Sequence, residues 1–216
     1  MPRRRVESIA IMHVASAGFF DVGPDDSDSE RAVEVPPIPP WLGPPQDVIP
    51  GRVLLDELVH RDDATAVLLR EVRVYPDGVE LRIRWVRRRR GESEREWHRW
   101  IQERHMVPPS DDVEPDGLHV GVRLADGTRV LPLGMRRAWQ PYADRVPPTL
   151  TVLGGGGGGG LDQYDGAVNA WLGLGGPVEG ALEAVLQWRA IGLDETSVLI
   201  PAELVQTAPS ARPLWP

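Results

Sequence analysis

The chain has 216 residues, of which 24 are basic and 32 acidic, so its formal net charge at pH 7 is −8. All the basic residues are arginines, and the chain contains no lysine and no cysteine. Without lysine, Schiff-base catalysis and the Gly-Lys-Ser/Thr phosphate loop are excluded. Without cysteine, thiol nucleophiles, thiolate metal sites and disulfides are excluded. The negative net charge disfavours nucleic acid and anionic membranes as partners.

The first 40 residues are predicted to form a disordered leader. Residues 21–34 hold six acidic residues and one arginine, and prolines recur between Pro36 and Pro50. Such a segment buries too little apolar surface to offset the entropy lost on ordering. We therefore expect residues 41–216 to form a single β domain, with the chain docking from Trp41 onward because rigid prolines follow that aromatic residue.

The N-terminus shares some features with a secretory signal. Arg3, Arg4 and Arg5 precede a moderately apolar stretch that extends to Phe20. Acidic and imidazole side chains interrupt that stretch, and no run in the sequence approaches the ~20 apolar residues of a membrane span. A cytoplasmic location is the expectation, secretion is the alternative, and Met12 is an alternative start.

Two β-hairpins are predicted after Gly51. Residues 79–85 alternate apolar and charged side chains, which is the period of a strand with one buried face. Pro76-Asp77-Gly78 supplies turn residues that join this strand to the Val- and Leu-rich segment at 65–75. By the same logic, Asp126-Gly127 joins residues 118–124 to residues 128–131.

The later segments complete the predicted fold. Residues 164–174 alternate like a strand, and residues 181–190 fit both a strand and a helix, with their shortness between two glycines favouring a strand. Residues 201–206 predict a short helix that begins at Pro201. Many short strands between Gly and Pro turns, with one short C-terminal helix, predict a mainly β fold: an antiparallel β-sandwich or open barrel.

The order of several turns and aromatic residues resembles a group of proteins of unknown function from GC-rich actinobacteria. The motifs are Val74-Tyr75-Pro76-Asp77-Gly78, Leu124-Ala125-Asp126-Gly127, the glycine run at 154–160, Gln187-Trp188 and Leu214-Trp215. The resemblance extends over roughly residues 41–216. It implies a fold type and a source, and it assigns no catalytic residue because no activity is associated with the group.

Residues 82–100 form the one basic region that also carries aromatic residues, with eight arginines against three glutamates. Guanidinium groups bind phosphates and indole rings stack on bases, so this region is a candidate contact for a protein partner or a polyanion. The competing interpretation is a solvated strand end and charged loop, which the net charge favours. The candidate contact residues are Arg87, Arg88, Arg89, Arg90, Trp97 and Trp100.

No metal, cofactor or catalytic residue is assigned from the sequence. The seven glycines at 154–160 lack the lysine and the following helix of a phosphate loop, so a flexible loop between two strands is predicted. Glu94, His98 and His105 would share a helix face but have no evident fourth ligand. The acidic run at 111–116 lacks the spacing of a calcium loop.

Three functional hypotheses follow. The first is a non-catalytic β-sandwich that binds a protein partner, because no catalytic constellation is recognisable and eight Trp stand against two Phe. The second is a small-ligand protein or hydrolase-like enzyme that uses Asp, Glu and His from separate strands. The third is nucleic-acid contact through Arg87–Arg90. Packing roles are predicted for Trp85, Trp139, Trp171 and Trp188.

Overall fold

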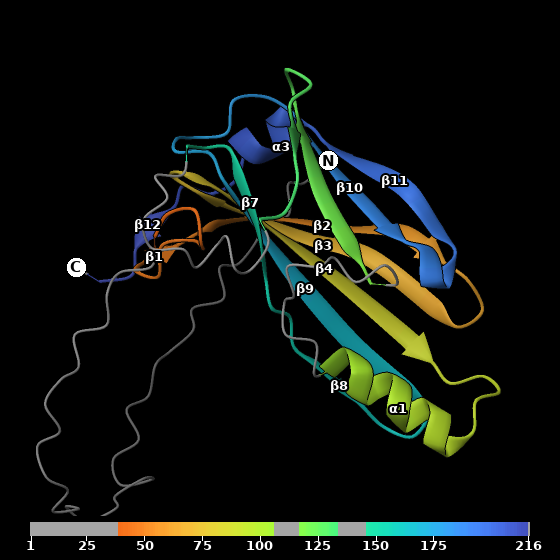
Figure 1. The fold of residues 1–216 in the computed structure, drawn as a ribbon. Helices are drawn as coiled ribbons and strands as arrows, with labels where there is room; N and C mark the ends of the chain where they lie inside the picture. The colour runs from red at the N-terminus through yellow and green to blue at the C-terminus, as the bar shows by residue number, and fades with distance from the viewer. Residues whose placement is uncertain (1–38, 106–116, 134–145, 216) are drawn as a thin grey trace, which may run out of the picture. The chain divides into compact units, whose positions relative to one another are not determined.

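The computed structural model describes residues 39–105, 117–133 and 146–215 (Figure 1). Within these residues the strands form antiparallel sheets of six, four and two strands, which confirms the predicted mainly β fold. The predicted leader, apart from Pro39 and Pro40, lies outside the described residues. The acidic run at 111–116 and Trp139 also lie outside them.

The six-stranded sheet has the order β2-β3-β4-β9-β7, and β8 pairs with the remaining half of β9. The hairpin formed by residues 65–75 and 78–88 confirms the prediction, because the turn at Pro76-Asp77 sets Tyr75 opposite Gly78. The strands are β2 (Gly51–Arg61), β3 (Thr65–Tyr75), β4 (Gly78–Arg88), β7 (Thr149–Leu153), β8 (Gly157–Gly159) and β9 (Gln163–Gly173).

The four-stranded sheet has the order β11-β10-β5-β6. The predicted hairpin at Asp126-Gly127 joins β5 to β6, and the ambiguous segment at 181–190 contains strand β10. The strands are β5 (His119–Leu124), β6 (Arg129–Val130), β10 (Leu182–Trp188) and β11 (Leu193–Ile200), with the short 3-10 helix η1 (Arg189–Ile191) before β11. The predicted C-terminal helix is confirmed as α3 (Ala202–Gln206), directly after Pro201.

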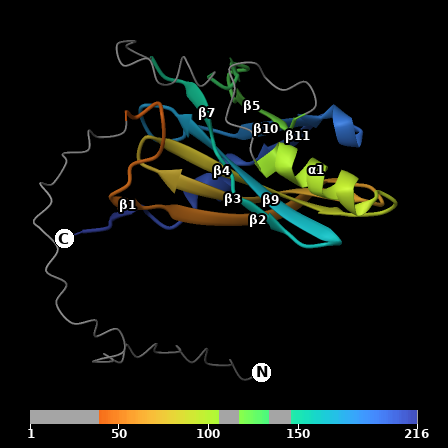
Figure 2. The same ribbon diagram turned by 60° about the horizontal axis from the view of Figure 1, so that its bottom comes forward.

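The two larger sheets pack face to face around one hydrophobic core (Figure 2). The indole rings of Trp85 on β4 and Trp188 on β10 lie 5.2 Å apart in an edge-on arrangement across this core. At one edge β2 lies beside β11, and at the other the Leu133 N–H donates to the Leu150 carbonyl of β7 at 2.7 Å. The sandwich therefore approaches an open barrel, as predicted.

Helix α1 (Glu94–His105) is absent from the predicted fold, although a helix in this stretch was considered for Glu94, His98 and His105. It begins with a capping box, because the Glu96 carboxylate accepts hydrogen bonds from the backbone N–H and the hydroxyl of Ser93 at 2.8 and 2.7 Å. Trp97, Trp100 and Ile101 follow at helical spacing and pack on the core at one end of the sandwich. In the described ranges, neither helix has the length and apolar character needed to cross a membrane.

The glycine run differs from the predicted flexible loop. Gly157–Gly159 form strand β8, which pairs with residues 164–166 of β9. A side chain at Gly155 would overlap the carbonyl group of Ala167, whereas one at Gly156 would meet nothing within 4 Å. Glycine is needed here for close approach of two backbones rather than for flexibility.

Candidate functional site

The candidate site lies on the outer face of the six-stranded sheet, which is the face opposite the core. Strand alternation turns Leu81 and Ile83 of β4 into the core and leaves Glu80 and Arg82 on the outer face. The register places Arg73 of β3 opposite Glu80. Opposite charges on neighbouring strands therefore face each other, which stabilises the pairing.

Two carboxylates and several guanidinium groups form a connected network on this face. Arg73 donates from Nε to Glu71 Oε1 and from Nη1 to Glu80 Oε2, both at 3.2 Å. Glu71 also lies 3.6 Å from Arg52 Nε and 3.5 Å from Arg82 Nη1. The Glu71 and Glu80 side chains are only 10% and 6% exposed. Burying carboxylates is costly unless they are paired, so the guanidinium groups fix them in place.

The proline-rich segment before β2 covers one end of the outer face. Trp171 Nε1 donates to the Pro40 carbonyl, and Thr151 Oγ1 donates to the Trp41 carbonyl, both at 2.7 Å. Among the described residues, docking contacts are therefore present at Trp41, as predicted, and also at Pro40. Prolines lose little entropy on ordering, which suits a segment held by few contacts.

The far end of this segment is tied to the C-terminal part of the chain. Strand β1 (Val48–Ile49) pairs antiparallel with β12 (Arg212–Pro213). The Leu214 N–H also donates to the Asp47 carbonyl at 2.6 Å. Residues 39–50 therefore form a wall that is anchored at both ends.

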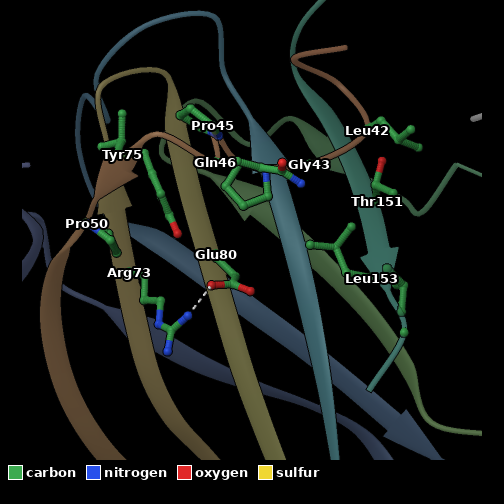
Figure 3. Close-up of a pocket in the computed structure, with 14 residues that line it drawn as sticks. Leu42, Gly43, Pro45, Gln46, Pro50, Arg73, Tyr75, Glu80, Thr151 and Leu153 are labelled. Carbon is green, nitrogen blue, oxygen red and sulfur yellow. Dashed lines mark hydrogen bonds and ion pairs between the residues drawn. The ribbon is translucent and has the colours of Figure 1, made fainter. Parts of the chain in front are cut away.

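A cavity of about 650 Å³, which we call the outer-face pocket, lies between this wall and the sheet (Figure 3). Its volume is within the range of about 300–1,000 Å³ that is usual for ligand sites. Its walls are mainly apolar, and the ion pair between Arg73 and Glu80 lies at its floor. The lining residues are Leu42, Gly43, Pro44, Pro45, Gln46, Val48, Pro50, Arg73, Tyr75, Glu80, Thr151, Val152, Leu153 and Gly154.

Burial and neighbouring charges shift the pKa values of two residues that line the pocket, Arg73 and Tyr75. Burial alone would lower the pKa of Arg73, but the hydrogen bond to Glu71 and the charges of Glu80 and Glu71 raise this pKa above its ordinary value. Burial, together with the charge of Glu80, raises the pKa of Tyr75. At neutral pH Arg73 is therefore a cation and Tyr75 a protonated phenol.

A smaller hollow of about 170 Å³ lies farther along the same face, and we call it the arginine hollow. Arg84 donates from Nε to both oxygens of Asp165, at 2.9 and 3.0 Å, and this hydrogen bonding raises the pKa of Arg84. Arg82 Nε donates to Asn169 Oδ1 at 3.2 Å. The lining residues are Leu54, Arg70, Glu71, Arg82, Ile83, Arg84, Asp165 and Ala167.

Most of the predicted contact arginines hold the corner between β4 and α1. Arg87 Nη2 donates to Glu92 Oε1 at 2.6 Å. Arg89 Nε donates to the Glu92 carbonyl at 2.7 Å, and Arg90 Nε donates to the Asp63 carbonyl at 2.6 Å. The guanidinium groups of Arg87, Arg89 and Arg90 therefore bind groups within the chain. Arg88 and Arg90 are exposed, so their contact with a protein partner or a polyanion stays a prediction.

The two predicted contact tryptophans pack into the sandwich. Trp97 is fully buried, and its Nε1 donates to the Gly160 carbonyl at 2.9 Å. The rings of Trp97 and Trp100 stack with centroids 5.4 Å apart, and the Arg87 guanidinium lies 4.4 Å from the Trp100 ring centroid. The burial of Trp97 argues against a direct contact role for this residue. Sequence reasoning placed it at the surface because it did not include the capping box of α1.

The corner at Glu92 predicts a specific pH dependence. Hydrogen bonds lower the pKa of Glu92 from 4.5 to about 2. The largest contribution comes from the backbone N–H of Arg90, and the Arg87 side chain and the Gly91 N–H add to it. A lowered folded-state pKa stabilises the fold above the unfolded value, and this contribution is lost as the pH falls from about 4.5 towards 2. Glu92→Gln should therefore destabilise the protein at about pH 6 and matter progressively less below about pH 4.5.

Urea unfolding of the wild type and Glu92→Gln at about pH 6, 4.5 and 3 measures this change. The exposed Glu94→Gln, in the first turn of α1, is the control, and we expect it to lie close to the wild type. A gap between the wild type and Glu92→Gln that stays constant across this range would contradict the assignment.

The other sequence candidates do not converge on a site. Within the described residues, no three His, Asp or Glu side chains are grouped to hold a metal ion. Glu94 and His98 are exposed on α1, and the His105 side chain lies outside the part of the chain whose side chains are described. Trp171 and Trp188 are buried, as predicted.

The sequence did not identify Arg73, Tyr75 or Glu80 as candidate site residues. The signal was nevertheless present, because a turn at Pro76-Asp77 places residues at equal distances on either side of it opposite each other. Applying that register would have put Arg73 opposite Glu80. The proline-rich wall had no such signal, since it is held by hydrogen bonds to distant residues.

No protein-family model matches the chain, and comparisons with curated proteins and with solved structures give no significant match. Assigning a function to this fold therefore depends on the chemistry of the outer face itself.

Proposed function

We propose that this chain is a non-catalytic binding protein that takes up an extended segment of a partner protein in the outer-face pocket. The observation that carries the proposal is the combination of an apolar-walled cavity of about 650 Å³ with an Arg73–Glu80 ion pair fixed at its floor. A fixed donor and a fixed acceptor suit a ligand that brings both kinds of group, as a peptide backbone does.

The lining supports binding rather than acid–base chemistry. Glu80 is the only carboxylate among the described lining residues, and its Oε2 already accepts a hydrogen bond from Arg73. General acid–base catalysis requires a group that can exchange a proton with the substrate. A carboxylate held by a guanidinium group is better suited to orient a ligand.

The shape of the pocket supports an extended chain. One side is residues 42–50, and the other is formed by consecutive residues 151–154 at the end of β7. Between them the pocket is open to solvent, so a chain can enter and leave it, unlike a cofactor that is mostly enclosed. Apolar walls from Pro44, Pro45 and Leu153 fit an apolar side chain of that segment.

Selection from a random heptapeptide library displayed on phage, with the full chain as the target, tests this proposal. Gln46→Trp should fill the pocket from its exposed rim without disturbing the core. Asp47→Trp is the matched control, because Asp47 is the exposed neighbour of Gln46 and does not line the pocket. Thermal unfolding of both variants should match that of the wild type.

Peptides selected on the wild type should bind Gln46→Trp at least about tenfold more weakly, a loss of about 1.4 kcal/mol, and bind Asp47→Trp as they bind the wild type. Fluorescence anisotropy of labelled synthetic peptides measures both affinities. The proposal is wrong if no peptide is enriched, or if the enriched peptides bind Gln46→Trp as tightly as the wild type.

A further inference from the structure

We infer that the bound segment carries an acidic side chain, which occupies the arginine hollow two residues from the apolar side chain in the outer-face pocket. This inference rests on the proposed function and specifies the chemistry of the partner. It comes from the charges of the hollow, the burial of its acidic groups and the spacing of the two cavities.

The arginine hollow offers more donors than acceptors. Arg70, Arg82 and Arg84 all line it, and their side chains are 40%, 37% and 38% exposed. Arg70 pairs with Asp56, Arg82 contacts Asn169 and Glu71, and Arg84 pairs with Asp165. Each guanidinium carries five N–H groups, and these contacts engage only part of each group. An occupant with oxygen acceptors and a negative charge would accept hydrogen bonds from the remaining N–H groups.

The acidic groups of the hollow do not block such an occupant. Glu71 is 10% exposed and already lies within 3.6 Å of Arg52 and Arg73, and within 3.5 Å of Arg82. Asp165 accepts hydrogen bonds from Arg84. The exposed Leu54, also on the lining, can contact the aliphatic part of an incoming Asp or Glu side chain.

The spacing of the two cavities fits an extended peptide. Arg73 lines the outer-face pocket and Glu71 lines the arginine hollow, while Glu80 and Arg82 are divided between the cavities in the same way on β4. Residues two apart on one strand face are separated by about 6.4–6.8 Å. An extended ligand advances by the same distance in two residues and keeps both side chains on one face, so an apolar side chain and an acidic one two positions apart reach both cavities.

A carboxylate on a peptide fits better than a phosphate on a nucleic acid. The adjoining pocket is walled by Pro, Leu and Val side chains, and its two charged lining residues, Arg73 and Glu80, neutralise each other. The whole chain also carries a net charge of −8, which repels a polyanion but has less effect on a segment with one acidic side chain.

The test uses the synthetic peptide from the most enriched clone whose binding is lost in Gln46→Trp. We expect Asp or Glu two positions from an apolar residue, and a peptide with Gln or Asn at that position should bind at least about tenfold more weakly. The protein variant Arg82→Gln should remove most of this difference between the two peptides. The control Arg129→Gln, an exposed arginine on β6 of the other sheet, should preserve it.

The outcomes separate this inference from the proposed function. If no enriched peptide depends on the pocket, both are wrong. If the peptides that depend on the pocket carry no acidic residue, only the inference of an acidic side chain is wrong. The same holds if these peptides bind equally well after the acidic residue is replaced by Gln or Asn. It is also overturned if single-stranded oligothymidylate displaces the peptide at a lower concentration than unlabelled peptide does.

Discussion

Replacing Gly155 by alanine is expected to lower the free energy of unfolding by about 3 kcal/mol, at the upper end of the usual cost of overpacking. The new methyl group would overlap the carbonyl of Ala167 in β9, and a backbone group cannot move aside as a flexible side chain can. Relief requires separating the edge of the six-stranded sheet from β9.

The matched control is Gly156→Ala in the same glycine run. A methyl group at this position meets nothing within 4 Å, so the change should stay within about 0.5 kcal/mol of the wild type. Urea denaturation of the wild type and both variants measures the difference. Equal stability of the two variants would show that the run is the flexible loop expected from its composition.

Replacing Trp97 by alanine should lower the free energy of unfolding by about 4 kcal/mol, within the range for deleting a fully buried large side chain. The change removes the stacking with Trp100 and the hydrogen bond to the Gly160 carbonyl. Because Trp97 joins α1 to the core, far-ultraviolet circular dichroism should also report loss of helix. Denaturation monitored by that signal measures both effects.

Two further variants distinguish the loss of Trp97 packing from a general sensitivity of α1 to substitution. Trp97→Phe keeps an aromatic ring but loses the hydrogen bond, so the loss should be about 1–2 kcal/mol. His98→Ala changes the adjacent exposed residue and should stay within about 0.5 kcal/mol. If Trp97→Ala were as mild as His98→Ala, Trp97 would not anchor α1, and a surface role for it would regain support.

The hairpins were predictable because their signals are local. At residues 65–88 a turn and an alternating strand lie next to each other, so the sequence determines both the pairing and the buried face. Strand β10 was harder to predict, because its apolar residues fit the periods of both a strand and a helix. Its pairing with β5 and β11 makes it a strand. The strand at Gly157–Gly159 had no side-chain signal, because glycine carries no pattern.

The candidate site was only partly predictable. The alternation that includes Glu80 and Arg82 was visible, but it indicated only a solvated face. Its connection to Glu71 and Arg73 depends on cross-strand register, and its cover depends on contacts between Pro40 and Trp171, 131 residues apart. The arginine cluster at 87–90 attracted attention by its density, yet three of its four side chains stabilise a corner.

The pairing of β1 with β12 has a consequence for the order of assembly during synthesis. Strand β1 is part of the pocket wall, whereas β12 comes last in chain order among the strands of the described residues. Domains form as translation proceeds, so the sheets can assemble before this last pairing closes the wall. In the function proposed above, the pocket would therefore gain its complete wall only after β12 has left the ribosome.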